Sequence, residues 1–159
     1  MEAQIKTKPA FSVIGIEGRG DANKGPEWIE PLWNKAFNRF NEIKELVESG
    51  RESWGLMSAV DEYLAPWKKE GKYLAGWEVK PDAKPPEGWT IWKVPKHTYA
   101  VVACTMTTYG EAFKFVFQQV LPKEGYEQAG AVHEFYPKEF QDTRKGTLFL
   151  FFTIKKKKD

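Results

Sequence analysis

The chain has 159 residues, of which 42% are hydrophobic, 29% charged and 15% aromatic, which is typical of one folded domain and excludes a disordered chain or a multidomain enzyme. Its single cysteine, Cys104, excludes an internal disulfide framework, and two histidines are too few for an ordinary zinc site, so neither a metal nor a cofactor is expected. The net charge is +2, but residues 155–159 carry +3 and the other 154 residues carry −1, so the sequence predicts no basic face for direct nucleic-acid binding.

Membrane association and secretion are also disfavoured. The chain contains no apolar run long enough to cross a bilayer, and residues 1–11 lack the apolar core of a signal peptide. We therefore expect a cytoplasmic protein with no membrane partner. The basic residues 155–159 are expected to form a solvated tail that can be deleted with little loss of stability.

Four elements are predicted in the first half of the chain. Their apolar residues alternate where a strand is expected and recur at three- and four-residue spacing where a helix is expected. They are a strand at residues 10–16, a long helix from Gly25-Pro26 to Gly50, and strands at residues 54–59 and 73–79.

A proline-rich break at residues 81–88 separates this half from a second set of elements. These are a strand formed by residues 89–94 and 99–105 that is interrupted or bent near Pro95, a helix at residues 109–121, and strands at residues 131–136 and 147–154. The last strand, TLFLFFTI, is apolar on both faces, so we predict that it is central in its sheet.

Each half, at about residues 5–80 and 88–155, is thus predicted to contain a strand, a helix and two further strands. This order favours an α+β fold made of two antiparallel sheets, each with one helix on one face. Placed side by side, the two units would leave their uncovered sheet faces around a central cleft, which is the expected place for a functional site.

The tetrapeptide at residues 133–136, HEFY, lies in one predicted strand. Alternation places His133 and Phe135 on one face, where a helix is expected, and Glu134 and Tyr136 on the other, facing the cleft. A carboxylate beside a wholly apolar strand is costly unless it is paired or functional. The alternative is that Glu134 lies at a sheet edge, bonded to a lysine or to backbone.

These features together resemble the GyrI-like family. The resemblance rests on the order of elements, on PPEGWTIWKVPKHTYAVV at residues 85–102, and on EFYP at residues 134–137, and it covers about residues 5–155. The family comprises effector-binding domains of AraC- and MerR-type transcription regulators and free-standing proteins. It implies one domain over residues 1–159, built from duplicated βαββ (SHS2-type) units, with no room left for a DNA-binding helix-turn-helix.

The resemblance also implies a central pocket lined by aromatic side chains, with a glutamate at its floor that corresponds to Glu134. The aromatic residues that it places in this ligand-binding pocket come from both halves of the chain. They are Tyr136, Trp77, Trp92, Phe149, Phe151 and Trp33.

Three functions agree with this resemblance, and the sequence does not separate them. The first is binding of hydrophobic or cationic small molecules with multidrug-like breadth, with a separate regulator or a second copy of the chain as partner. The second is hydrolysis of cyclopropanoid, electrophilic natural products, in which Glu134 is the acid or base and Tyr136 positions the substrate carbonyl. The third is direct protein binding, as in gyrase inhibitors.

Overall fold

The computed structural model describes residues 1–48, 50, 52–143 and 145–158. Within these residues the helices are too short and too polar to cross a membrane. The strands are β1 (Ala3–Lys8), β2 (Phe11–Asp21), β3 (Ser53–Ser58), β4 (Glu70–Val79), β5 (Thr90–Val94), β6 (His97–Cys104), β7 (Tyr126–Tyr136) and β8 (Leu148–Lys156). The α-helices are α1 (Gly25–Asn38), α2 (Tyr109–Phe115), α3 (Leu121–Glu124) and α4 (Lys138–Thr143), and short helical turns lie at Ala22–Lys24 and Phe40–Glu42.

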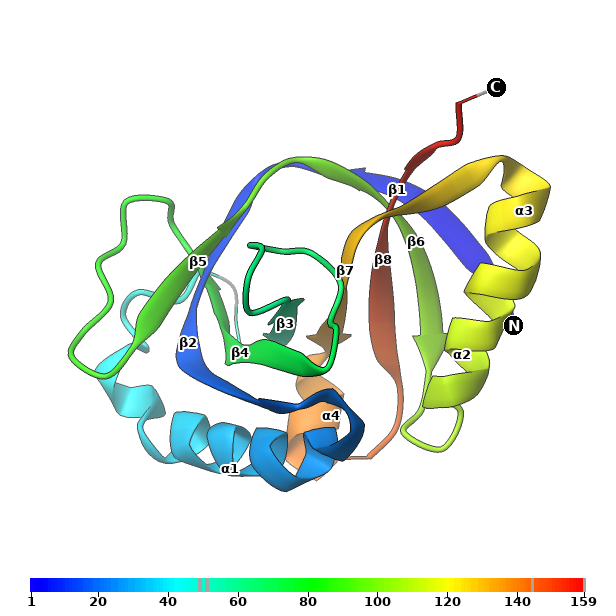
Figure 1. Cartoon of the computed structure of the whole chain (residues 1–159). Coiled ribbons are helices and arrows are strands. Elements are labelled where there is room, and N and C mark those ends of the chain that lie inside the picture. The colour runs from blue at the N-terminus through cyan, green and yellow to red at the C-terminus, as the bar shows by residue number, and fades with distance from the viewer. Residues whose placement is uncertain (49, 51, 144, 159) are drawn as a thin grey trace.

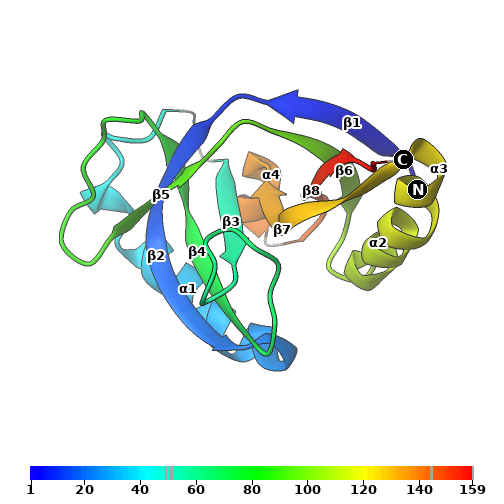
Figure 2. The same ribbon diagram turned by 45° about the horizontal axis from the view of Figure 1, so that its top comes forward.

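All eight strands belong to one antiparallel sheet, in the order β1-β6-β8-β7-β3-β4-β2-β5. Strand β1 leads directly into β2, and β5 leads directly into β6. The β1–β2 segment pairs with the β5–β6 segment along its length, with Lys8 opposite His97 and Phe11 opposite Val94. The two ends of the sheet therefore meet, and the sheet curves round on itself (Figures 1 and 2).

The curved sheet has an inner and an outer face, and each is apolar. On the outer face, α1 covers the first-half strands and α2 with α3 covers the second-half strands, each over its own buried cluster (Figure 1). The inner face holds a third cluster around Trp54 and Trp92, against which Leu64 of the β3–β4 connection packs. Strands that are apolar on both sides result from burial on both faces.

The sequence predicts two separate sheets, and this is wrong. Strand β3 pairs with β7, with Trp54 opposite Phe135, so the first-half order β2-β4-β3 joins the second-half order β7-β8-β6 in one sheet. The predicted cleft lay between the sheet faces that the helices leave uncovered. Instead, the helices of both halves lie on the same outer face of one sheet (Figure 1). Any cleft between the halves is therefore bounded by helices as well as by the sheet.

Two predicted helices differ in extent from the observed ones. Helix α1 ends at Asn38 instead of continuing to Gly50. The later apolar residues of the stripe still pack on the core, but from turns and a bridge: Ile43 is fully buried, and Val47 is partly buried and pairs with Val79. The three- and four-residue spacing therefore predicted correctly which residues pack on the core, but it predicted a helix that is too long.

The second helix passes through Pro122, which the sequence predicts to end it. A π-helical turn at Val116–Val120 precedes α3, so the proline falls in the first turn of α3, where a missing N–H is tolerated. The helix ends at Gly125, which adopts φ +74°, a conformation that glycine accommodates without strain.

The predicted central position of the last strand is confirmed, because β8 pairs with β6 on one side and β7 on the other. Residues 155–158 of the tail are exposed as predicted, but the first two of them belong to the last strand rather than following it. Strand β8 continues to Lys156, with Lys155 opposite Glu127 and the Lys156 ammonium 4.3 Å from the Tyr126 ring centre. The apolar run in the sequence ends at Ile154, whereas the backbone pairing with β7 continues to Lys156.

Candidate functional site

A cavity of about 660 Å³ opens on the outer face of the sheet, where β3 and β7 join the two halves. Helix α1 forms one wall, and the segment that leads into α2, together with α4, forms the other. Its walls are mainly apolar and aromatic, with a few polar groups at the floor. The large apolar lining residues are Ile29, Trp33, Phe37, Met57, Trp67, Met106 and Phe140. The polar ones include Asn23, Glu30, Ser53, Tyr109, Glu134 and Tyr136, of which Ser53, Glu134 and Tyr136 are buried.

Glu134 lies at the floor of the cavity and is only 6% exposed. Its Oε1 accepts hydrogen bonds from the hydroxyls of Tyr73, at 2.5 Å, and of Tyr136, at 2.7 Å. Its Oε2 accepts a third hydrogen bond from the Tyr109 hydroxyl. The donors come from β4, β7 and the start of α2, so one carboxylate ties together both halves of the molecule.

Burial raises the pKa of Glu134 above its ordinary value, and the hydrogen bonds from Tyr109, Tyr73 and Tyr136 oppose part of that effect. Burial, followed by the negative charge of Glu134, raises the pKa of each of these tyrosines well above 10. The three hydroxyls therefore remain protonated donors, and the negative charge in this cluster stays on the carboxylate.

A glycine on β3 makes room for the carboxylate and its donors. Gly55 lies opposite Glu134 in the sheet, and a Cβ atom there would come 1.9 Å from the Tyr73 hydroxyl oxygen and 2.7 Å from Glu134 Oε1. Both atoms are held by a hydrogen bond to each other, so neither can move away without breaking it. Gly55 is thus needed for close packing of the Tyr73–Glu134 pair.

Trp33 of α1 connects the cavity wall to the floor. Its Nε1 donates to the Tyr73 hydroxyl oxygen at 2.9 Å. Its ring meets the ring of Tyr136 edge to face, with centroids 5.5 Å apart, and stacks with Phe37 at 5.6 Å. Tyr73 thus accepts from Trp33 and donates to Glu134, which fixes the orientation of both.

The structure brings together three of the residues that the resemblance places in the pocket: Glu134, Tyr136 and Trp33 line this one cavity. Glu134 and Tyr136 share a face as predicted, but it is the face that the helices cover. The edge alternative for Glu134 is wrong, because β7 lies between β8 and β3.

The other four predicted pocket residues lie outside the cavity. Trp77 is buried beneath Phe37 and Phe40 in the cluster under α1. Phe149 and Phe151 alternate with Leu148 and Leu150 on β8, so they lie on the inner face. A strand that is apolar on both sides does not reveal from its sequence which of its aromatic residues face a site.

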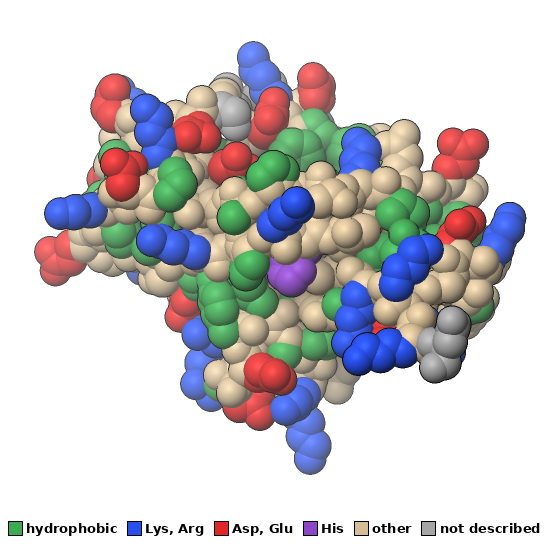
Figure 3. All heavy atoms as spheres, turned by 90° about the horizontal axis from the view of Figure 1, so that it is seen from above, with side chains coloured by type: hydrophobic (Ala, Val, Ile, Leu, Met, Phe, Trp, Pro, Cys, Tyr) green, Lys and Arg blue, Asp and Glu red, His purple; other side chains and the backbone are tan. Residues whose placement is uncertain are grey.

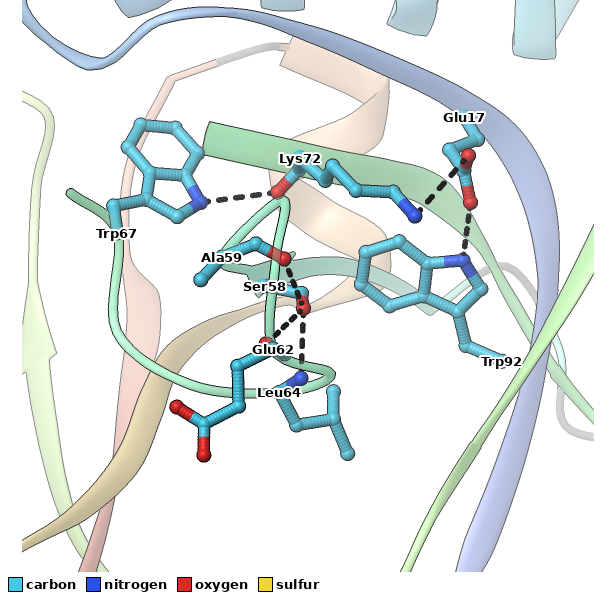
Figure 4. A network of polar contacts seen from close by, with 8 residues as sticks. All are labelled: Glu17, Ser58, Ala59, Glu62, Leu64, Trp67, Lys72 and Trp92. Carbon is cyan, nitrogen blue, oxygen red and sulfur yellow. Dashed lines mark hydrogen bonds and ion pairs between the residues drawn. The ribbon is translucent and has the colours of Figure 1, made fainter. Parts of the chain in front are cut away.

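Trp92 also lies in the inner cluster, where its Nε1 donates to Glu17 Oε1 at 2.6 Å. The Lys72 ammonium is 3.6 Å from Glu17 Oε2, and the backbone oxygen of Lys72 accepts a hydrogen bond from Trp67 Nε1 at 3.0 Å (Figure 4). The connection that carries Trp67 is held further by Ser58 Oγ, which accepts from the Leu64 N–H at 2.7 Å. Trp92 thus supports the segment that positions Trp67, instead of lining the cavity itself.

Sequence reasoning missed Tyr73, Tyr109, Gly55, Ser53 and Trp67. Tyr73 could have been found from its spacing, because it is four residues before Trp77 on one strand and so shares its face. Tyr109 begins a helix, and its approach to Glu134 depends on tertiary packing that no local pattern reports.

The surface charge agrees with the composition. The face seen from above carries lysine, arginine, aspartate and glutamate side chains interspersed with one another (Figure 3). Nucleic-acid binding generally depends on a continuous basic area, which this face does not present.

We predict that Gly55→Ala destabilises the protein by about 1–3 kcal/mol, because the new methyl group overlaps Tyr73 and Glu134. Gly110→Ala is the matched control, since a Cβ atom there meets nothing within 4 Å and lies in α2, where alanine is preferred. Denaturant unfolding of both variants measures the difference. Equal stability of the Gly55 variant and the native protein would contradict the packing described here.

Comparison with known proteins identifies the family. Residues 1–149 match the model of the GyrI-like small molecule binding domain family. The transcriptional regulator BrlR of Pseudomonas aeruginosa PAO1 is 31% identical over 144 residues, which are 89% of this chain and 50% of BrlR. The chain thus spans half the length of this curated relative.

Two solved structures share the fold. SAV2435 bound to tetraphenylphosphonium superposes with a TM-score of 0.71 at 12% identity, over 98% of this chain and 94% of that chain. EcmrR in its complex with DNA gives a TM-score of 0.71 at 15% identity, over 98% of this chain and 57% of that chain. With the family match over nearly all of its length, the chain belongs to the GyrI-like small molecule binding domain family.

Proposed function

We propose that the protein binds hydrophobic organic cations in the cavity above Glu134. The observation that carries this proposal is the carboxylate of Glu134, 6% exposed, at the floor of a mainly apolar cavity whose other lining carboxylate, Glu30, is exposed. The described residues that line the cavity include no lysine or arginine to neutralise it. An apolar cation therefore gains both the attraction of the charge and the burial of its own surface.

The hydrogen bonds around Glu134 favour a particular kind of cation. Three tyrosine hydroxyls already donate to its two oxygens. A ligand that needs several N–H donors to the carboxylate would displace these bonds, whereas a cation with its charge spread over apolar groups would not. The faces of Trp33 and Trp67 supply cation–π contacts of about 0.5–2 kcal/mol each. A relative in fold, SAV2435, was solved with tetraphenylphosphonium, which is a cation of this kind.

We propose further that ligand binding serves effector sensing for transcription. The chain corresponds to half of BrlR and to 57% of EcmrR in its DNA complex, which supports a role as a ligand-sensing module. The signal would pass to a separate regulator or between two copies of the chain, and sequestration of the ligand is the simplest alternative output.

We also interpret the two halves as repeats of one βαββ unit. The strand orders β2-β4-β3 and β6-β8-β7 support this, as does the position of α1 and α2 after the first strand of each set. The cavity would then lie on the axis between the repeats, where β3 meets β7.

Glu134→Gln is expected to weaken tetraphenylphosphonium binding by about 10- to 100-fold, because it removes the charge while keeping the side-chain volume. The melting temperature should change little, because removal of a desolvated charge is offset by the loss of charge-assisted hydrogen bonds from the three tyrosines. Glu127→Gln, on the same strand but half-exposed, outside the cavity and paired with Lys155, is the control and should bind normally. Calorimetric titration measures the affinities, and melting curves measure the stabilities. Equal affinities of the Glu134→Gln and Glu127→Gln variants for tetraphenylphosphonium would contradict the proposal.

The affinity for tetraphenylphosphonium should also depend on pH. The pKa of Glu134 is raised, and only the ionised carboxylate attracts the cation. Affinity should therefore increase as the pH rises through this raised pKa, by up to about tenfold per pH unit, and level off above it. The Glu134→Gln variant should show a flat profile over the same range.

A second proposal is hydrolysis of electrophilic, cyclopropanoid compounds. The raised pKa of Glu134 favours it, because burial shifts the pKa of this carboxyl group in the direction that general acid or base catalysis requires. Tyr136, bonded to Glu134, would position the substrate carbonyl. Mass spectrometry should then detect a hydrated product with the native protein and a 10²–10⁴-fold slower reaction with Glu134→Gln. Unchanged compound in both samples would leave binding as the function.

A further inference from the structure

The hydroxyl of Ser53 is the unusual polar group of the cavity. Ser53 begins β3, lines the cavity and is 1% exposed, yet its Oγ has no hydrogen-bond partner among the described residues. A buried hydroxyl without a partner costs about 1–3 kcal/mol, so such groups are rare in folded proteins.

The position of Ser53 relates it directly to the carboxylate site. It lies opposite Tyr136 in the β3–β7 ladder, two residues before Gly55, so its side chain shares the face that carries Tyr136 and Glu134. The hydroxyls of Tyr109 and Tyr136 both donate to Glu134. The Ser53 hydroxyl therefore offers hydrogen-bonding capacity that a ligand can use beside the charge.

We propose that Ser53 is a specificity-determining residue, and that the preferred ligand is a hydrophobic cation that carries a hydroxyl group. This inference rests on the proposed binding of hydrophobic cations and adds to it the chemistry of a second contact. Charge and ring faces discriminate poorly among flat hydrophobic cations. A hydrogen bond to a buried serine discriminates well, because a ligand without the matching group leaves that serine unpaired.

Two matched phosphonium probes test the inference: [4-(hydroxymethyl)phenyl]triphenylphosphonium and its nearly isosteric (4-ethylphenyl)triphenylphosphonium counterpart. Their affinities for the native protein, Ser53→Ala and Ser12→Ala are measured by calorimetric titration. Ser12 is a buried serine on β2 and does not line the cavity, so its variant is the control.

We expect Ser53→Ala to lower the affinity for the hydroxymethyl probe about tenfold and to leave that for the ethyl probe unchanged. Ser12→Ala should change neither affinity. A purely structural role for Ser53 would lower both affinities together, and an unused hydroxyl would lower neither; either result overturns the inference. If neither probe binds the native protein, the proposed function fails, and this inference fails with it.

Discussion

A carboxylate buried in an aromatic cavity is costly, and much of the architecture around Glu134 serves to hold it there. Removing such a group from water costs several kcal/mol unless hydrogen bonds replace the lost solvation. Here three tyrosine hydroxyls do so, from two strands and a helix that lie far apart in the sequence. The charge remains exposed to the cavity alone, where a cation can use it.

The join between β3 and β7 makes this arrangement possible. It places Gly55 opposite Glu134, and the missing side chain leaves the space that the Tyr73 hydroxyl occupies. The same join places the cavity between helices of the two halves, so that Trp33 of α1 reaches Tyr136 of β7. One sheet that curves round on itself thus brings groups from both halves to one carboxylate.

The sequence predicted much of the fold and part of the site. Alternation placed Glu134 and Tyr136 on one face, and the apolar pattern of residues 147–154 predicted a central strand. The same apolar pattern hid which of Phe149 and Leu150 faces inward, because both faces of that strand are buried. Sequence spacing also predicted two sheets, because strand pairing between halves depends on edge contacts that leave no local periodicity. The roles of Tyr109 and Gly55 were not predicted, because their contacts with Glu134 also join segments that are distant in the sequence.

The charge state of Glu134 is the most direct test of this account. The side-chain carboxyl signal can be followed by carbon-13 NMR as the pH is varied, with and without tetraphenylphosphonium, and with Glu134→Gln to assign it. Burial predicts a pKa above the usual glutamate value in the free protein, and a lower one when the cation is bound, because bound positive charge favours the ionised form. An ordinary pKa that the cation does not change would contradict the central claim.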